Sequence, residues 1–108
     1  MTTPLRLAGA AAFAAALAAV HVPAAAQTDA LQARNLAATC ANCHGTDGRA
    51  RGDMRPLAGR PAAATLAMLA DYRSGALPAT IMHQIVKGYT EPQLKLIAEY
   101  FAAQKPAP

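Results

Sequence analysis

Apolar residues recur at helical spacing near both ends of the region that follows residue 26. Residues three and four positions apart lie on one face of a helix, so these runs predict helices with a buried side. Asp29, with Gln32 three residues on, is typical of a helix start. The apolar face of this first helix, which runs into the cysteines, contains Ala33, Leu36, Ala37 and Cys40. The last helix follows Thr90 and Gln93, a capping-box pattern around Pro92. Its apolar face contains Leu94, Ile97, Ala98 and Phe101.

The middle of the chain predicts a loop and two shorter helices. Glycines and a proline between residues 45 and 59 indicate an irregular loop that wraps around the domain. Pro61 suits the first turn of a second helix that ends at Ser74 and Gly75. The apolar face of that helix contains Leu66, Leu69 and Ala70. Thr80 is the expected cap of a third helix that Gly88 stops. Its apolar side contains Ile81, Met82, Ile85 and Val86. No segment alternates as a strand would, so the pattern predicts an all-α domain of about four short helices.

The first 26 residues have the outline of a secretion signal. Arg6 precedes an Ala- and Leu-rich stretch without acidic residues, which is short for a bilayer core of about 30 Å. Ala24 to Ala26 supply the small residues that a signal peptidase needs, so we expect cleavage after Ala26. An uncleaved anchor helix is the alternative. The expected domains are a signal peptide over 1–26, a folded domain over 27–105 and a frayed tail over 106–108, with no permanent membrane anchor after cleavage.

Composition limits what the mature chain can do. It lies near the size, about 80 residues, below which one core seldom supplies much stability and a cofactor, metal or disulfide often helps. Alanine dominates the apolar residues and tryptophan is absent, so a large apolar ligand or a partner subunit must fill the interior. The formal charge of +4 falls by one when Arg6 is removed. Because the arginines lack interleaved aromatic residues, we exclude nucleic-acid binding.

The specific chemical signal is the run Cys40-Ala41-Asn42-Cys43-His44. A C-x-x-C-H run is typical of covalent attachment of haem c. Two sulfurs on one helical turn can each bond to a vinyl group of the porphyrin, which places the next residue beneath the iron. This predicts one covalently bound haem with His44 as an iron ligand.

Three other uses of these cysteines are weaker. A thioredoxin-like dithiol would be expected beside a βαβ pattern, which this sequence lacks. A zinc site needs four ligands, and after the motif only His83 remains in the mature chain. A disulfide between Cys40 and Cys43 would close a very small loop and stabilise little.

The chain resembles the class I cytochromes c, in particular the short bacterial single-haem branch. Its segment from Ala79 to Met82 and on through Lys87-Gly88-Tyr89 is similar to the cytochrome subunits of sulfide-oxidising flavocytochromes c. The resemblance implies a cytochrome c fold in which the first and last helices cross at Tyr100 or Phe101. It also implies that a methionine is the second axial ligand of the iron and that the Pro56 carbonyl accepts the free N–H of the ligand imidazole.

Three methionines of the mature chain compete for the axial position. Met54 follows His44 closely in the glycine loop, which leaves little chain to reach the opposite haem face. Met68 lies within the second helix, where methionine is usually core filling. Met82 opens the third helix on its apolar side and matches the family motif, so it is the favoured ligand. His83 is a further competitor, but helical spacing turns it away from that face, and we expect it to face solvent.

The outer positions are less specific. Five arginines are candidates for pairing with haem propionates or for a docking rim toward an acidic partner, and each is also explained as a solvated charge. They are Arg49, Arg51, Arg55, Arg60 and Arg73. Pro56 is also explained as a residue that only turns the loop. Lys87 and Tyr89 belong to the family motif, but their sequence context assigns no physical role to them.

A haem with His and Met ligands has no open coordination position, so the expected function is one-electron transfer and not catalysis on a substrate. We expect a periplasmic carrier that cycles between Fe(II) and Fe(III) and makes brief contacts with redox partner proteins. One alternative is a fixed electron-accepting subunit beside a flavoprotein that oxidises sulfide. Another is a haem peroxidase or sensor from which Met82 dissociates.

Overall fold

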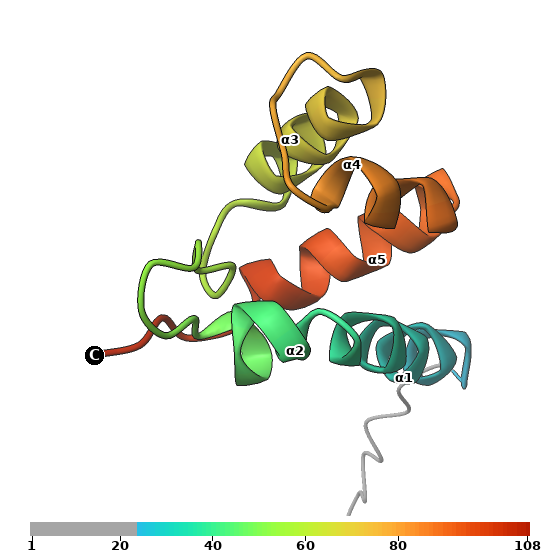
Figure 1. Cartoon of the computed structure of the whole chain (residues 1–108). Coiled ribbons are helices and arrows are strands. Elements are labelled where there is room, and N and C mark those ends of the chain that lie inside the picture. Colours follow the sequence, from blue (N-terminus) through green and yellow to red (C-terminus); the bar gives the residue numbers. More distant parts are fainter. Residues whose placement is uncertain (1–23) are drawn as a thin grey trace, which may run out of the picture.

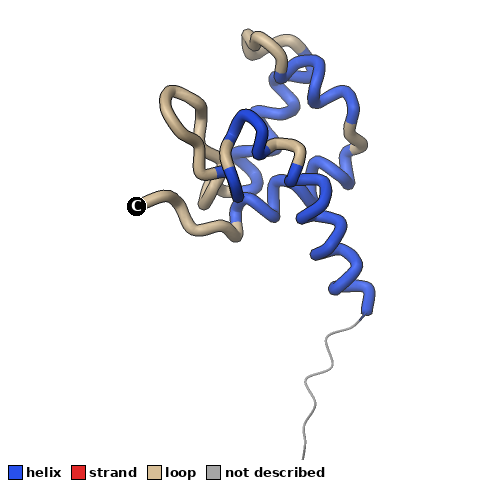
Figure 2. The backbone as a smooth tube through the Cα atoms, turned by 60° about the horizontal axis from the view of Figure 1, so that its bottom comes forward, coloured by secondary structure: helices blue, strands red, loops and turns tan. Residues whose placement is uncertain are grey.

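The computed structural model describes residues 24–108, and every regular element in that range is a helix (Figures 1 and 2). The α-helices are α1 (Ala24–Ala38), α2 (Ala41–His44), α3 (Ala62–Ser74), α4 (Met82–Ile85) and α5 (Glu91–Ala102). Two short 3-10 helices are η1 (Thr46–Gly48) and η2 (Val86–Gly88). The all-α prediction is therefore confirmed. The predicted signal segment falls outside the described residues, apart from its last three positions. Within residues 24–108, no helix has the length and apolar character needed to span a membrane.

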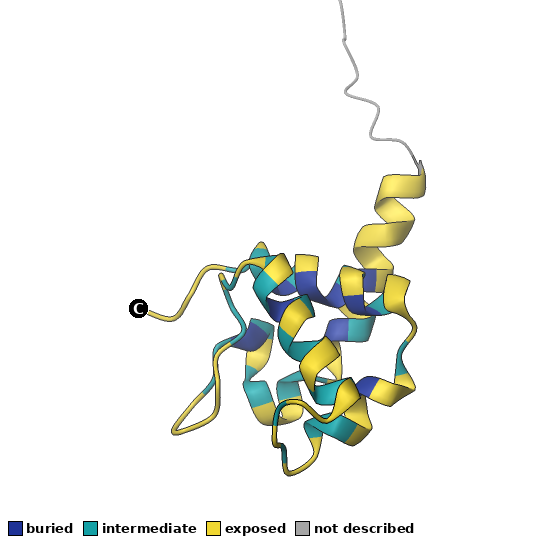
Figure 3. Cartoon of the chain, turned by 90° about the horizontal axis from the view of Figure 1, so that it is seen from above, coloured by how far each residue is buried: buried dark blue, intermediate teal, exposed yellow. Residues whose placement is uncertain are grey.

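The first helix differs from its prediction at both ends. It begins at Ala24, five residues before Asp29, and it ends at Ala38, two residues before Cys40. The residues from Ala25 to Gln32 are exposed, so the first two turns extend from the body of the domain (Figure 3). Burial begins at Ala33 and Ala37, which are two of the four positions predicted for the apolar face.

The last helix forms as predicted and carries most of the core. Gln93 N donates to Thr90 Oγ1 and Thr90 N donates to Gln93 Oε1, which completes the capping box. All four residues predicted for its apolar face are buried: Leu94, Ile97, Ala98 and Phe101.

Helices α1 and α5 pack against each other, with α3 and α4 on the other side of α5 (Figure 1). Ala37 of α1 meets Ile97 and Phe101 of α5 in the central cluster. The small alanine allows the two helix axes to approach closely. Phe101 therefore lies at the predicted crossing, with the Tyr100 ring against its edge at a centroid distance of 5.3 Å.

Helix α3 has the predicted bounds, but its predicted apolar face is only partly covered, because Leu66 and Leu69 are half-buried and Ala70 is exposed. It follows Pro61 and ends where Gly75 adopts a left-handed conformation at φ +82°. Such a conformation is accessible to glycine at little cost and satisfies the last carbonyl groups of a helix. The Gly75 N–H donates to the Tyr72 carbonyl.

Helix α4 begins differently from its prediction. Ile81 is at the cap position with a non-helical backbone, and no side chain caps the helix, so the expected capping role of Thr80 is wrong. After one turn the chain tightens into η2, which ends at Gly88 as predicted. The residues of the predicted apolar side differ in burial: Val86 is fully buried, whereas Ile81 and Ile85 are exposed.

The loop predicted over residues 45–59 is irregular except for η1, and it packs on the end of α5. Gly48 carries the tight contact: its carbonyl accepts from Leu57 N and Ala58 N at 2.9 and 3.1 Å. A Cβ atom at Gly48 would lie 2.7 Å from Phe101 Cδ1, so only glycine fits between the loop and α5. Gly59 N then donates to the Phe101 carbonyl at 2.9 Å.

The C-terminal end of the domain and the first residue of the predicted tail, Pro106, contact the loop. Arg49 Nε donates to the Lys105 carbonyl at 2.9 Å. The ring of Pro106 lies against Gly59, where an added Cβ would meet its Cγ at 2.6 Å. The tail thus adds a second contact to the loop.

Candidate functional site

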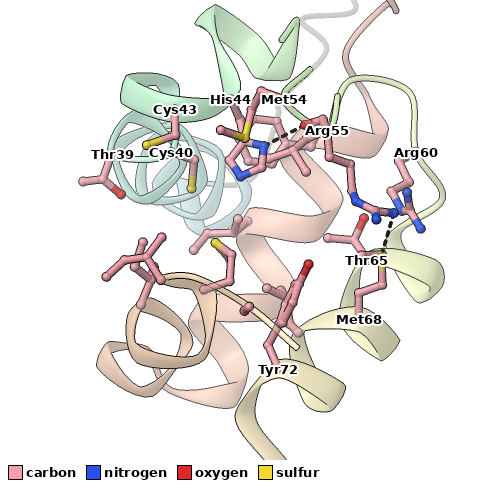
Figure 4. A pocket seen from close by; sticks show the side chains of 18 of the residues that line it. Thr39, Cys40, Cys43, His44, Met54, Arg55, Arg60, Thr65, Met68 and Tyr72 are labelled. Atoms are coloured by element: carbon pink, nitrogen blue, oxygen red, sulfur yellow. Dashed lines mark hydrogen bonds between the residues drawn. The ribbon is translucent and has the colours of Figure 1, made fainter. Parts of the chain in front are cut away.

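A cavity of about 560 Å³ opens between α2 with the loop that follows it and the helices α3 and α4 (Figure 4). Its walls come from α2, the loop 45–61, α3, residues 78–85 and α5. Cofactor and ligand sites commonly have volumes of about 300–1,000 Å³ and mainly apolar walls. Leucine, isoleucine, methionine and aromatic side chains make up most of these walls, which agrees with a site for a large apolar ligand.

The C-x-x-C-H run lies at one side of the cavity. His44 N donates to the Cys40 carbonyl at 2.9 Å, so the motif forms one helical turn. Cys40, Cys43 and His44 all line the cavity, and both cysteines are free thiols. The structure brings the three predicted residues together on one wall.

Burial raises the pKa of the Cys40 thiol, because the thiolate would lose its water, and a hydrogen bond from Thr39 opposes this effect. A cysteine that acts in dithiol exchange needs a lowered pKa. The raised pKa of Cys40 is opposite to the change that favours a dithiol nucleophile.

The His44 imidazole is fixed by the loop that follows it. Its Nδ1 atom lies 2.7 Å from the carbonyl oxygen of Arg55. The prediction that Pro56 supplies this carbonyl is wrong by one residue. Proline restricts the residue before it to extended backbone, so the peptide group between Arg55 and Pro56 has limited freedom to turn away. With Nδ1 engaged, Nε2 is the ring nitrogen available to a metal.

All three candidate methionines line the cavity, from different walls. Met54 is drawn beside His44, on the same side as the cysteines, whereas Met68 lies across from them (Figure 4). Met68 Sδ accepts a long hydrogen bond from Arg55 Nη1 at 3.7 Å. Met82 reaches the cavity from the first residue of α4.

His83 does not line the cavity. It is half-buried, and its Nδ1 atom is buried without a hydrogen-bond partner in the described part of the chain. The expectation that it faces solvent is therefore wrong for this edge of the imidazole, and the helix that carries it, α4, packs against α3 and η2.

The five candidate arginines lie in four different surroundings. Arg55 and Arg60 line the cavity, and Arg51 is exposed on the loop outside it. Arg49 pairs with Asp47 at 3.3 Å and holds the tail.

Arg73 is a structural residue, and neither a docking role nor a ligand-binding role fits it. It forms an ion pair with Glu91 and donates to the carbonyls of Val86 and Tyr89 at 3.0 and 2.7 Å. These contacts tie α3 to the segment between η2 and α5. Local sequence patterns carry no signal for them because the partners lie 13 to 18 residues away.

Tyr89 gains a role that its sequence context did not assign. Its hydroxyl lies 2.8 Å from Thr39 Oγ1, and both residues line the cavity next to Cys40. The contact joins positions 50 residues apart and closes the cavity wall beside the first cysteine.

The cavity fits a flat apolar group with sulfur attachment at one edge and negative charge at the other. Cys40 and Cys43 lie at one side, and Arg60 and Thr65 lie at the opposite side (Figure 4). Arg60 Nε and Thr65 Oγ1 are buried polar atoms without a protein partner in the described residues. Buried polar groups usually have partners, so this side of the cavity is suited to a ligand with hydrogen-bond acceptors.

Comparison with known proteins supports this interpretation. The chain is 38% identical over 66 residues to the cytochrome subunit of sulfide dehydrogenase from Chlorobaculum tepidum, which is 61% of this chain and 60% of that protein. It is 34% identical over 64 residues to cytochrome c-552 from Acidithiobacillus ferridurans, which is 59% of this chain and 28% of that protein. The matches thus span less than two thirds of either relative. No protein-family model matches the chain.

Proposed function

We propose that this cytochrome c-like protein is a single-haem electron carrier. The haem is attached at Cys40 and Cys43, and its iron is held by His44 and Met82. The observation that carries the proposal is the C-x-x-C-H turn on the wall of a large apolar cavity that Met82 of α4 also lines. When bound, the haem supplies a reversible one-electron Fe(II)/Fe(III) couple.

The protein's part is to hold and orient the cofactor. Cys40 and Cys43 fix its position through thioether bonds. His44 presents Nε2 while the Arg55 carbonyl holds Nδ1 at 2.7 Å. Such a hydrogen bond fixes the ring orientation and makes the ligand nitrogen more basic.

Met82 is the best second ligand on three grounds. Met54 shares the His44 side of the cavity (Figure 4), and Met68 is engaged by Arg55. Met82 projects from α4, on a wall built by a different part of the chain from the His44 wall. Its thioether would complete the coordination and raise the reduction potential relative to a second nitrogen ligand.

Electron transfer needs access to one haem edge. Met54, Ile81 and Ile85 line the cavity and remain exposed, which supports an apolar opening at the surface. Redox partners typically meet over small, short-lived interfaces. We therefore propose transfer through this edge, without bond chemistry on a substrate.

The test is an optical study of the full chain expressed with a c-type maturation system. The pyridine haemochrome spectrum is expected to show haem with both vinyl groups converted to thioethers, and the colour is expected to stay with the protein in acid acetone. Cys40→Ser combined with Cys43→Ser is the matched control, in which the colour should extract. A colourless wild type would overturn the proposal.

A second candidate is a fixed haem subunit of a complex like sulfide dehydrogenase. The 38% identity to such a subunit favours it, as does the motif from Ala79 to Tyr89. A flavoprotein would then be the electron donor. Purification of the native protein from its source distinguishes the two, because a subunit copurifies with a flavoprotein in a constant ratio and a free carrier elutes alone.

We also propose export to the periplasm with cleavage after Ala26. The small residues at Ala24 to Ala26 support this position, which falls within the first turn of α1. Ala25 and Ala26 are exposed, and the buried residues of α1 begin at Ala33, so cleavage leaves the core contacts of α1 intact. Mass determination of the periplasmic protein tests the site, and a mass that retains residues 1–26 would contradict it.

A further inference from the structure

The side of the cavity opposite the cysteines contains two buried polar groups that have no hydrogen-bond partner among the described residues. Thr65 is only 6% exposed, lines the cavity, and its Oγ1 atom has no hydrogen-bond partner in residues 24–108. Arg60 lines the same part of the cavity, and its Nε atom is also buried without a partner. An unpartnered buried hydroxyl or guanidinium N–H costs free energy, so each is suited to a bound acceptor.

The electrostatics of this side favour a negative charge. The first turn of α3 begins between Arg60 and Thr65, and no side chain caps it. The N-terminal end of a helix carries partial positive charge and free N–H groups. Arg55 extends its guanidinium to the same region (Figure 4). There its Nη1 donates a long hydrogen bond, of 3.7 Å, to Met68 Sδ, which is a weak acceptor. Among the described residues, the cavity lining contains two arginines and no Asp or Glu.

We propose that Arg60 and Thr65, at the start of α3, form the binding site for a carboxylate of the bound haem. The inference rests on the proposed function, since the thioether bonds at Cys40 and Cys43 place the vinyl edge of the porphyrin at the far side. The two propionates project from the edge opposite the vinyl groups. A haem attached at the cysteines therefore directs its carboxylates toward Arg60 and Thr65.

The pairing has a consequence for the redox couple. A propionate paired with Arg60 stays ionised over the neutral pH range, because a neighbouring cation favours the charged form of a carboxylate. Loss of the guanidinium leaves that negative charge uncompensated, and the ferric state gains stability relative to the ferrous state. The midpoint potential then falls at neutral and alkaline pH and recovers at acid pH, where the propionate becomes protonated. The other titratable side chains that line the cavity are His44, bound to the Arg55 carbonyl, and Cys40, Cys43, Tyr72 and Tyr89.

The experiment measures the midpoint potential of the haem-loaded protein from about pH 5 to pH 9. Wild type, Arg60→Met and Thr65→Val are compared, with Arg51→Met as the control, because Arg51 is an exposed cation that does not line the cavity. We expect Arg60→Met to have a lower potential than wild type at pH 8, with a difference that narrows toward pH 5. Thr65→Val should show a smaller effect of the same sign, and Arg51→Met should follow the wild-type profile.

A second measurement uses the sign of a stability change. If the Thr65 hydroxyl binds a carboxylate, Thr65→Val lowers the unfolding midpoint of the haem-loaded protein. If the hydroxyl has no partner, valine removes a buried unpaired group and raises the midpoint. Variants that keep covalent haem, have the wild-type pH profile and are not destabilised at Thr65→Val would overturn the inference. A wild type without covalent haem would instead overturn the proposed function.

Discussion

The Tyr100 hydroxyl donates a hydrogen bond to Asp47 Oδ1 at 2.6 Å and so joins α5 to the turn that follows His44. Asp47 has a left-handed backbone, at φ +54°, which aspartate tolerates better than most residues. Its second oxygen pairs with Arg49, whose Nε holds the Lys105 carbonyl. One carboxylate thus links the turn directly after the C-x-x-C-H run to the last helix and, through Arg49, to the carbonyl of Lys105.

This link predicts a pH-dependent stability. The hydrogen bond to Asp47, burial and the carboxylate charge all raise the pKa of Tyr100. Folding therefore favours the protonated phenol. Its contribution is complete below the usual tyrosine pKa of about 10 and is lost as the pH rises through the higher folded-state pKa.

The comparison of wild type with Tyr100→Phe measures this contribution. We expect the variant to lose about 1 kcal/mol of unfolding free energy at pH 7, since a partly exposed hydrogen bond contributes modestly. The difference should shrink between about pH 10 and pH 12 in denaturant titrations. A difference that stays constant through this range would contradict the assignment.

Gly48 and Gly52 form a matched pair for testing the loop contact. Both have positive φ, at +76° and +62°, so alanine strains the backbone at either position. Only at Gly48 would the new Cβ meet other atoms, at 2.7 Å from Phe101 Cδ1. We expect Gly48→Ala to cost about 2–4 kcal/mol and Gly52→Ala about 1 kcal/mol, measured by thermal unfolding. Equal losses of unfolding free energy in the two variants would show that the loop is not in tight contact with α5 at Gly48.

Arg73 is expected to contribute more to stability than an ordinary surface charge. Arg73→Met removes the donors to two backbone carbonyls and one carboxylate, and we expect a loss of about 2 kcal/mol in guanidinium unfolding. Arg73→Lys should restore little, since a single ammonium group lacks the planar fork that reaches several acceptors. Lys95→Met breaks the exposed pair with Glu99 and should change stability by less than about 0.5 kcal/mol. A loss at Arg73→Met no larger than that of the control would refute this role.

The axial ligand is tested by three single substitutions to leucine. Met82→Leu should abolish the near-infrared absorption band that arises from sulfur bound to ferric haem, and it should lower the reduction potential. Met54→Leu and Met68→Leu should retain the band. Its disappearance in either of these variants, with retention in Met82→Leu, would reassign the ligand.

Much of the fold was predictable because its signals are local. The capping box at Thr90 and Gln93, the four buried positions of α5 and the Gly75 terminus each depend on residues within one or two helical turns. The same holds for the C-x-x-C-H run, in which one helical turn sets the spacing of the sulfurs and the imidazole. Helical periodicity and capping act over the same short range, so these features can be identified without tertiary information.

Two errors concern the short helix α4. Thr80 is of a residue type common at caps, yet Ile81 takes the cap position and no side chain caps the helix. His83 was expected in solvent from helical spacing alone, but α4 packs closely enough against its neighbours to bury one ring nitrogen.

The sequence alone determined the C-x-x-C-H run on one helical turn, the helical class and the apolar face of the last helix, since each follows from residue type and short-range spacing. Only the tertiary structure decided that Arg55 holds His44, that Arg73 ties α3 to the start of α5, and that Tyr89 reaches Thr39. These contacts join residues 11 to 50 positions apart. Chain folding brings such partners together through the packing of α1 and α3 on α5, which depends on the whole set of buried side chains and not on any one segment.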